Sequence, residues 1–344
     1  MTQHEDARRN LRQMDGDECG NTAPTRSQSR TPAESHSRSE MRELLRPHMK
    51  TAAQSLKRIR SAELRDRDIV FSALHHHLNI GMLAIAFYKL NNYAVPGVDG
   101  VTKEQYQQNL YTNLLKLRNL LINDRYKFTP VKRAYIQKPT GGTRPLGICI
   151  LEDKIVQGAL KLILEAAFDV HFAGFSYGFR PETRAHDGLD ALNIAIKQYP
   201  VNYILDADIM GCFDNINHDV LIKVLKLKIS DRRILTLINR MLKAGVLEEG
   251  TLYKQKMGVV QGAVISPLLA NIFLHHVIDK FFFDWRQWYM KTEGFSCMVR
   301  YADDFIIGFE HEEQALRFKM VLEDRLLCAG SFPSSDHFKR RFTQ

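Results

Sequence analysis

Apolar side chains recur at every third or fourth residue along much of this chain, which is the spacing of helices that bury one face. Leu74, Leu78 and Met82 show this pattern inside a first predicted helical region at 41–90. Three histidines at 75–77 would point in three directions on a helix, so we expect a helix surface there and not a metal site. Further helices are predicted at 103–123, 152–168, 186–198, 219–229, 231–244, 266–288 and 312–327.

Strands are predicted where short apolar or alternating runs lie between turn-forming residues. Residues 128–137 and 143–148 form a candidate hairpin around the sequence PTGG, and 201–208 alternates between two faces. Residues 297–300 and 305–309 flank a second turn of sequence YADD. Together these elements predict an α+β fold in which helices dominate.

Composition and charge narrow the class of protein. The chain has 344 residues, 44% hydrophobic and 25% charged, which suits one or two globular domains. Its 48 Lys and Arg exceed its 39 Asp and Glu, so the net charge is +9 and the expected partner is polyanionic, nucleic acid before membrane. No apolar stretch reaches the ~18–20 residues that a membrane-spanning helix needs, so no membrane is expected as a partner.

The start of the chain and the cysteines add two expectations. Residues 1–40 are rich in polar and basic residues and nearly free of large apolar side chains, which predicts a disordered basic tail. An organelle transit peptide is the alternative, but the acidic residues in this segment argue against it, because transit peptides contain few acids. The five cysteines are widely spaced with no CxxC pair, which argues against a zinc site and against a secreted framework and favours a reduced cytosolic compartment.

Three aspartates give the strongest chemical signal. Asp303 and Asp304 lie between two apolar strands, where a structural hairpin normally carries Asn-Gly or Asp-Gly. Two neighbouring carboxylates repel each other, and a divalent cation with oxygen ligands would cancel that repulsion. With Asp208 at the end of the strand at 201–208, three carboxylates could hold two Mg²⁺ ions ~4 Å apart for nucleotidyl transfer. Solvated loop carboxylates without a metal are the alternative.

Two weaker signals concern phosphate binding. Gly141 and Gly142, in the turn of the hairpin at 128–148, would let the backbone approach a phosphate. The basic residues of this hairpin are Lys132, Arg133, Lys138 and Arg144. The sequence GVVQG at 258–262 places two glycines around Gln261, which also indicates a close backbone approach to a ligand. Both features are common on protein surfaces, so neither identifies a site alone.

Seven sequence blocks, taken in order, resemble the reverse transcriptase domain encoded by group II introns, the intron reverse transcriptase/maturase family. The blocks are GVDGVT (97–102), KPTGGTRPLGI (138–148), EDKIVQGAL (152–160), FSYGFRPETRAHDGL (175–189), DADIMGCFDNINHDVLI (206–222), GVVQGAVISPLLANIFL (258–274) and VRYADDFIIGF (299–309). The YADD turn, the Gly-Gln-Gly stretch and the SYGFRP loop are together highly specific for this family.

The resemblance implies a right-hand polymerase with helix-rich fingers and an antiparallel palm sheet. It places an N-terminal extension and fingers at 41–200 and a palm with the YADD hairpin at 201–327. The implied activity is that of an RNA-directed DNA polymerase, which uses two Mg²⁺ ions and dNTPs to copy group II intron RNA from a DNA primer. That cDNA synthesis serves intron mobility, and the family also has a maturase role in RNA splicing.

The resemblance also implies a metal site and its catalytic residues. Asp208, Asp303 and Asp304 match the family's catalytic aspartates, and all three are implied metal ligands. The backbone carbonyl of Ile209 is expected to join them. Asp206 is an alternative to Asp208 as the first metal ligand, but the alignment of the sequence blocks favours Asp208.

The nucleotide-binding residues follow from the same blocks. Phe213 matches the aromatic steric gate that excludes a ribose 2′-hydroxyl and so selects dNTPs. Gln261 matches a nucleotide-contacting glutamine, and Lys138 and Arg144 match finger residues that hold the triphosphate. The loop around Arg180 is expected to contact template or finger backbone.

The chain departs from the family pattern mainly after residue 327. Val260 and Cys149 each stand where the family commonly has Pro, which are mild differences. Residues 328–344 form an atypical tail that matches neither a thumb, the maturase domain, nor an endonuclease segment, so we expect a truncated copy without a thumb. The alternatives are therefore a non-catalytic splicing cofactor that binds intron RNA and an inactive remnant. A bacterial cytoplasm is expected, an organelle is possible, and a homodimer is left open.

Overall fold

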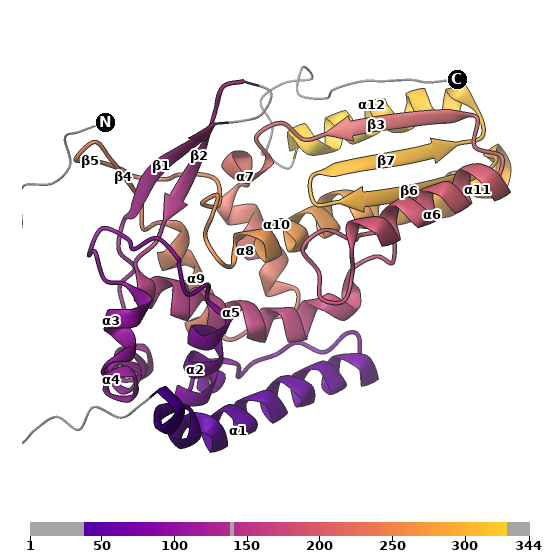
Figure 1. Ribbon diagram of the computed structural model, residues 1–344. Coiled ribbons are helices and arrows are strands. Elements are labelled where there is room, and N and C mark those ends of the chain that lie inside the picture. The colour runs from indigo at the N-terminus through magenta and orange to yellow at the C-terminus, as the bar shows by residue number, and fades with distance from the viewer. Residues whose placement is uncertain (1–37, 138–140, 329–344) are drawn as a thin grey trace, which may run out of the picture. The chain divides into compact units, whose positions relative to one another are not determined.

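The computed structural model describes residues 38–137 and 141–328. Most of the predicted tail at 1–40, Lys138 and the tail after residue 328 lie outside the described residues. Within the described ranges, the chain forms helices and two separate β-sheets (Figure 1). The expected α+β class is confirmed.

The N-terminal helices form one packed group. They are α1 (Arg38–Arg65), α2 (Ile80–Lys89), α3 (Lys103–Gln107), α4 (Leu110–Ile122) and α5 (Leu151–Phe168). The apolar α2 lies at the centre and packs against α1, α4 and α5. A Cβ on Gly81 would lie 2.0 Å from the His48 carbonyl oxygen, so glycine at this position is what allows α1 and α2 to approach so closely.

The predicted helical region at 41–90 is interrupted. After α1 the chain leaves the helical conformation, and α2 begins where Asn79 caps it by accepting from the Met82 N–H. Between them, the Asp231 carboxylate accepts hydrogen bonds from the backbone N–H groups of Leu74 and His75. These bonds hold a short 3₁₀ turn, η1 (His75–His77), in which His75 is buried. The expected histidine surface is therefore wrong for that residue.

The first sheet joins distant parts of the chain in the order β2-β1-β4-β5. Its strands are β1 (Val131–Gln137), β2 (Thr143–Ile148), β4 (Val246–Glu248) and β5 (Thr251–Tyr253). β1 pairs antiparallel with β2 and parallel with β4. The predicted β1–β2 hairpin is confirmed, whereas the β4–β5 hairpin was not predicted. Helices α8 (His218–Lys226) and α9 (Arg232–Leu242) precede β4 and match their predicted positions.

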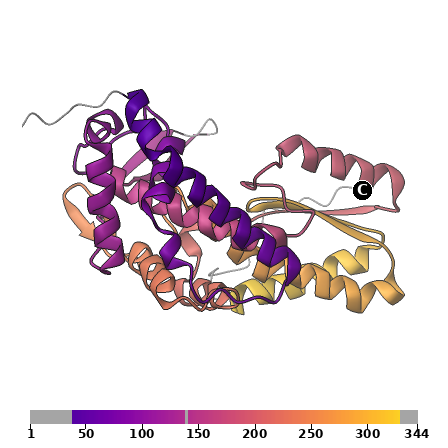
Figure 2. The same cartoon turned by 90° about the horizontal axis from the view of Figure 1, so that it is seen from below.

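The second sheet is antiparallel, with the order β3-β7-β6. Its strands are β3 (Tyr203–Asp208), β6 (Ser296–Tyr301) and β7 (Asp304–Phe309). Helix α6 (Ala185–Gln198) contacts β6, while α12 (Glu312–Cys328) contacts β3 and β7. Figure 2 shows these helices on opposite sides of the sheet. The Phe318 ring of α12 lies 5.7 Å from that of Phe309, which packs α12 onto β7.

A long helix that follows β5 in the chain is interrupted near its middle. It consists of α10 (Ser266–Leu274), a π-helical turn (His275–Asp279) and α11 (Lys280–Glu293). The prediction of a helix at 266–288 is confirmed, but its pattern gave no sign of the π-helical turn. None of the helices in the described ranges is long and apolar enough to cross a bilayer.

Candidate active site

The predicted aspartates meet at one end of the three-stranded sheet. β3 ends at Asp208 and β7 begins at Asp304, and the strand register places these two residues opposite each other. Asp303 precedes Asp304 in the turn that joins β6 to β7. In Figure 1 this is the end of the sheet that lies nearest to α7. The structure therefore gathers the three carboxylates from two adjacent strands, as expected.

The carboxylates disturb one another electrostatically. Burial, followed by the negative charges of Asp208 and Asp303, raises the pKa of Asp304 to about 6. Burial also raises the pKa of Asp303, and the Asp208 charge adds to that shift while Arg144 opposes it. Such mutual repulsion is what a divalent cation relieves.

The donor set fits a hard cation, although it is not preassembled as a cage. Within the described ranges, no group of three or more His, Cys, Asp or Glu side chains is arranged to hold a metal ion. The three carboxylates are nevertheless the oxygen ligands that Mg²⁺ prefers. The carbonyl of Ile209 accepts a hydrogen bond of 3.1 Å from the Cys212 N–H, which leaves one lone pair for a cation. These four groups are the ones that would hold Mg²⁺.

The turn that carries Asp303 is tight. Of its two central residues, Ala302 has a positive φ of 60° and Asp303 does not, which is the pattern of a type II′ hairpin turn. Glycine is usual at the first central position because a Cβ is strained there. Ala302 is also buried. The surrounding structure must therefore hold this turn in place.

Phe213 and Gln261 are brought together by backbone pairing. Phe213 lies on the short helix α7 (Cys212–Asn215), which follows directly after β3. The Val259 N–H donates to the Phe213 carbonyl at 2.7 Å, so the Gly-Gln-Gly loop lies alongside α7. The Gln261 side-chain amide then donates to the Asp214 carboxylate at 3.2 Å. Asp214 is thus the partner that orients the Gln261 side chain.

The basic hairpin reaches the same site from the other sheet. The Gly147 N–H of β2 donates to the Gln261 carbonyl at 2.7 Å, which fastens β2 to the Gly-Gln-Gly loop. Arg144 lies on β2 with an exposed side chain, and its charge lowers the pKa of Asp303. The predicted contact of Lys138 with a nucleotide falls outside the described residues. The described part of the hairpin therefore places positive charge near the carboxylates, as a triphosphate would need.

Arg180 makes contacts within its own loop. Its guanidinium donates to the Asp169 carboxylate and to the carbonyls of Ala173 and Ser176. These carbonyls lie within the predicted fingers at 41–200, so the expected contact with finger backbone is confirmed for the Arg180 side chain. Contact of this loop with a template stays a prediction. The loop itself packs against the YADD turn, a relationship that no sequence pattern indicated.

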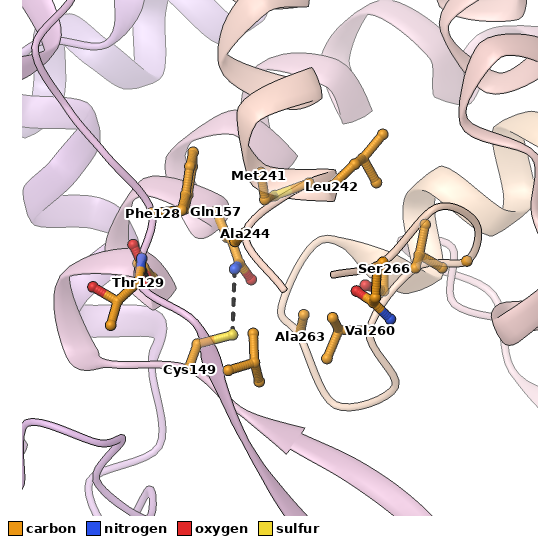
Figure 3. Close-up of a pocket in the computed structure, with 15 residues that line it drawn as sticks. Phe128, Thr129, Cys149, Gln157, Met241, Leu242, Ala244, Val260, Ala263 and Ser266 are labelled. Carbon is orange, nitrogen blue, oxygen red and sulfur yellow. Dashed lines mark hydrogen bonds between the residues drawn. The ribbon is translucent and has the colours of Figure 1, made fainter. Parts of the chain in front are cut away.

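A small cavity behind the Gly-Gln-Gly loop is structural. It has a volume of about 20 Å³ and is lined among others by Cys149, Gln157, Val260 and Ser266 (Figure 3). Gln157 and Cys149 point toward each other, and the Gln157 amide donates to the Cys149 sulfur at 3.4 Å. Such a volume holds about one water molecule. Because ligand pockets are typically ~300 Å³ or larger, this cavity is too small to hold a nucleotide.

Comparison with known proteins gives a consistent result. The family described as reverse transcriptase (RNA-dependent DNA polymerase) matches residues 136–331. Protein YkfC of Escherichia coli (strain K12) is 34% identical over 252 residues, which cover 64% of this chain and 66% of YkfC. The group II intron-encoded protein LtrA of Lactococcus lactis subsp. cremoris is 34% identical over 235 residues, or 68% of this chain and 39% of LtrA. The chain thus spans less than two thirds of either relative.

Among solved structures, telomerase from Candida albicans in complex with a fragment of telomeric RNA resembles this chain. The match covers 69% of this chain and 47% of the telomerase chain, with 16% identity and a TM-score of 0.47.

Proposed function

Because this chain belongs to the reverse transcriptase (RNA-dependent DNA polymerase) family, with group II intron-encoded proteins among its relatives, we propose that it is an RNA-directed DNA polymerase. It extends a DNA primer with dNTPs along a group II intron RNA template, the step that supports intron mobility. The observation that carries the proposal is the convergence of Asp208, Asp303 and Asp304 at one end of the β3-β7-β6 sheet.

The carboxylates and the Ile209 carbonyl would hold two Mg²⁺ ions. When bound, these ions would activate the primer 3′-hydroxyl and stabilise the charge on the transferring phosphate and the leaving pyrophosphate. The protein's own contribution is to keep Asp208 and Asp303 close despite their repulsion. β3 and β7 do this through continuous antiparallel pairing that ends at the Asp208–Asp304 pair.

The surrounding residues position the nucleotide. Phe213, half-buried on α7, would face the sugar and exclude a 2′-hydroxyl. Gln261 would contact the nucleotide while Asp214 holds its amide. Arg144, together with Lys138, would hold the triphosphate. RNA template binding would rest mainly on phosphate contacts and on A-form shape. The proposed compartment is a bacterial cytoplasm, with an organelle as the alternative.

Primer extension tests this function directly. Poly(rA)/oligo(dT) and dTTP are supplied with Mg²⁺ at low salt, and the full chain is compared with an Asp303→Asn variant. The wild type should extend the primer, and the variant should lose at least about 10²-fold in rate, because a group that stabilises transition-state charge is gone. Equal extension by the variant would refute the assignment.

A second candidate is a splicing cofactor that binds intron RNA without polymerising. It is favoured by the exposed basic side chains of α1, which include Arg42, Arg46, Lys50, Lys57, Arg58, Arg60 and Arg65. Basic residues one helical turn apart can contact successive phosphates of an RNA backbone. Their contribution to RNA affinity would fall steeply as the salt concentration rises. Salt-dependent binding of intron RNA with no dTTP incorporation would favour this candidate.

A further inference from the structure

Arg300 is a fully buried cation next to the proposed active site. Its exposed fraction is 0%, and so is that of Asp279. The guanidinium binds the Asp279 carboxylate through both ends of its fork, with Nε–Oδ1 at 2.7 Å and Nη2–Oδ2 at 2.6 Å. A buried ion pair is costly to desolvate and often adds little net stability. Its presence here therefore calls for a role besides packing.

The third nitrogen of Arg300 reaches the YADD turn. Nη1 donates to the Ala302 carbonyl at 2.9 Å and to the Asn271 side-chain oxygen at 3.1 Å. The Ala302 carbonyl belongs to the peptide that links Ala302 to Asp303. Since Ala302 has a strained positive φ, this hydrogen bond fixes the orientation of the very peptide that carries Asp303.

The opposite side of the turn is held by the SYGFRP loop. The Asn271 side-chain amide donates to the Gly178 carbonyl at 2.7 Å, so Asn271 bridges Arg300 and that loop. The Arg300 backbone N–H donates to the Phe175 carbonyl, and the Tyr177 N–H donates to the Arg300 carbonyl. Arg300 therefore lies at the centre of contacts from the long helix, the loop and the hairpin.

The π-helical turn explains how two residues of one helix reach the same guanidinium. Asn271 and Asp279 are eight residues apart, and in a regular α-helix their directions would differ by about 80°. A π-helical turn takes up one extra residue, which reduces the difference to about 20°. His275 lies in the same turn and its ring nitrogen is 3.1 Å from the Asp279 carboxylate. The helical irregularity thus presents both partners to Arg300.

We propose that Arg300, Asp279 and Asn271 form a clamp that positions the Asp303 carboxylate near Asp208 for metal binding. Arg300 is in this view a positioning residue, since it contacts the turn and not the substrate. The inference rests on the proposed polymerase function. When residues that hydrogen-bond to metal ligands and orient them are mutated, metal affinity or activity typically falls by about 10–100-fold.

Two variants distinguish a role of Arg300 in positioning Asp303 from a contribution to folding stability alone. Arg300→Lys keeps a positive charge beside Asp279, but one ammonium cannot reproduce the planar fork that also reaches Ala302. The double variant Arg300→Met with Asp279→Leu removes both charges, which avoids leaving one of them buried and unpaired. A matched control is Arg325→Lys, because Arg325 donates to the carbonyls of Val277 and His276 in the same π-helical turn.

The experiment measures Mn²⁺ binding by calorimetry on the full chain, with Asp303→Asn as the reference for loss of the site. Thermal unfolding and the kcat and KM for dTTP incorporation at varied Mg²⁺ accompany it. We expect Arg300→Lys and the double variant to weaken Mn²⁺ binding about 10–100-fold and to lower kcat with little change in the dTTP KM. The double variant should keep a wild-type unfolding midpoint, and Arg325→Lys should match the wild type throughout.

Three results would overturn the clamp. They are wild-type Mn²⁺ affinity in a folded double variant, an equal loss of affinity in Arg325→Lys, and the absence of any wild-type Mn²⁺ binding that depends on Asp303. If the wild type binds Mn²⁺ yet incorporates no dTTP, the proposed function fails, and the affinity comparison still decides whether the clamp exists.

Discussion

Gly178 lies against the backbone of Ala302 so closely that a Cβ on Gly178 would be 2.3 Å from the Ala302 nitrogen. The SYGFRP loop therefore supports the YADD turn directly, over a distance of many residues in sequence. No side chain larger than that of glycine fits at this position unless the turn moves.

Replacing Gly178 with Ala should displace the turn and lower polymerase activity. A misplacement of about 1 Å can cost up to about 10²-fold in rate, and overpacking should cost about 1–3 kcal/mol of stability. Steady-state dTTP incorporation and urea unfolding measure the two effects. Gly174→Ala in the same loop is the matched control, since no atom outside its chain neighbours lies within 4 Å of the added Cβ. Equal behaviour of the two variants would contradict the proposed support.

Asp153 should make the stability of the fold depend on pH. It is 1% exposed, and burial raises its pKa from 3.8 to about 7, although hydrogen bonds from Tyr126 and Thr129 oppose the shift. The folded state thus binds the proton more tightly than the unfolded chain. Its contribution is present below pH ~4 and is lost as the pH rises through ~7, by up to about 4 kcal/mol.

Asp153→Asn should remove this dependence. An asparagine can still accept from the Thr129 N–H and can donate to the Tyr126 hydroxyl, so the local hydrogen bonds survive. Urea unfolding of both proteins at pH 5 and pH 8 gives the comparison. The loss of stability between these pH values should be clearly smaller in the variant, and an identical loss would show that Asp153 does not carry it.

Phe213→Ala should relax the choice between deoxyribonucleotides and ribonucleotides. If the ring blocks a 2′-hydroxyl, its removal should reduce the preference for dTTP over UTP by up to about 10²-fold, the scale on which pocket shape discriminates a hydroxyl. The ratio of kcat/KM values for the two nucleotides measures this. An unchanged ratio in an active variant would exclude Phe213 as the steric gate.

The stability of the fold should depend on the ion pair between the buried Glu63 carboxylate and Lys228. Glu63 is 0% exposed, and the Lys228 ammonium donates to its carboxylate at 3.0 Å across two distant parts of the chain. Lys228→Met leaves Glu63 buried and short of its cation, at a cost of about 3 kcal/mol. Thermal unfolding should show that adding Glu63→Met restores part of that loss. A double variant less stable than Lys228→Met would contradict the pairing.

Local patterns predicted most of the elements but not their interruptions. The strands around the YADD turn and helices such as α5 and α12 follow from apolar spacing that tertiary contacts do not override. The break between α1 and α2 depends on Asp231, which is more than 150 residues away and leaves no local trace. The β4–β5 turn uses Glu249 and Gly250, both at positive φ, in place of the usual Asn-Gly or Asp-Gly.

The candidate site shows the same division. The motifs located Asp208, Asp303 and Asp304, since catalytic residue types keep their sequence spacing. Their supports could not be predicted. Arg300 reads as one polar residue in an apolar strand, and its partner Asp279 is recognisable only after the π-helical turn is known.

The most direct test of the central claim compares Asp208→Asn with Asp206→Asn in Mg²⁺-dependent primer extension. Asp206 lies two residues earlier on β3, on the same face but farther from the sheet end, where it pairs with Ile306. Asp208→Asn should reduce dTTP incorporation by at least about 10²-fold, while Asp206→Asn should retain most of the activity. Near wild-type activity in Asp208→Asn, or an equal loss in Asp206→Asn, would contradict an active site built on Asp208, Asp303 and Asp304.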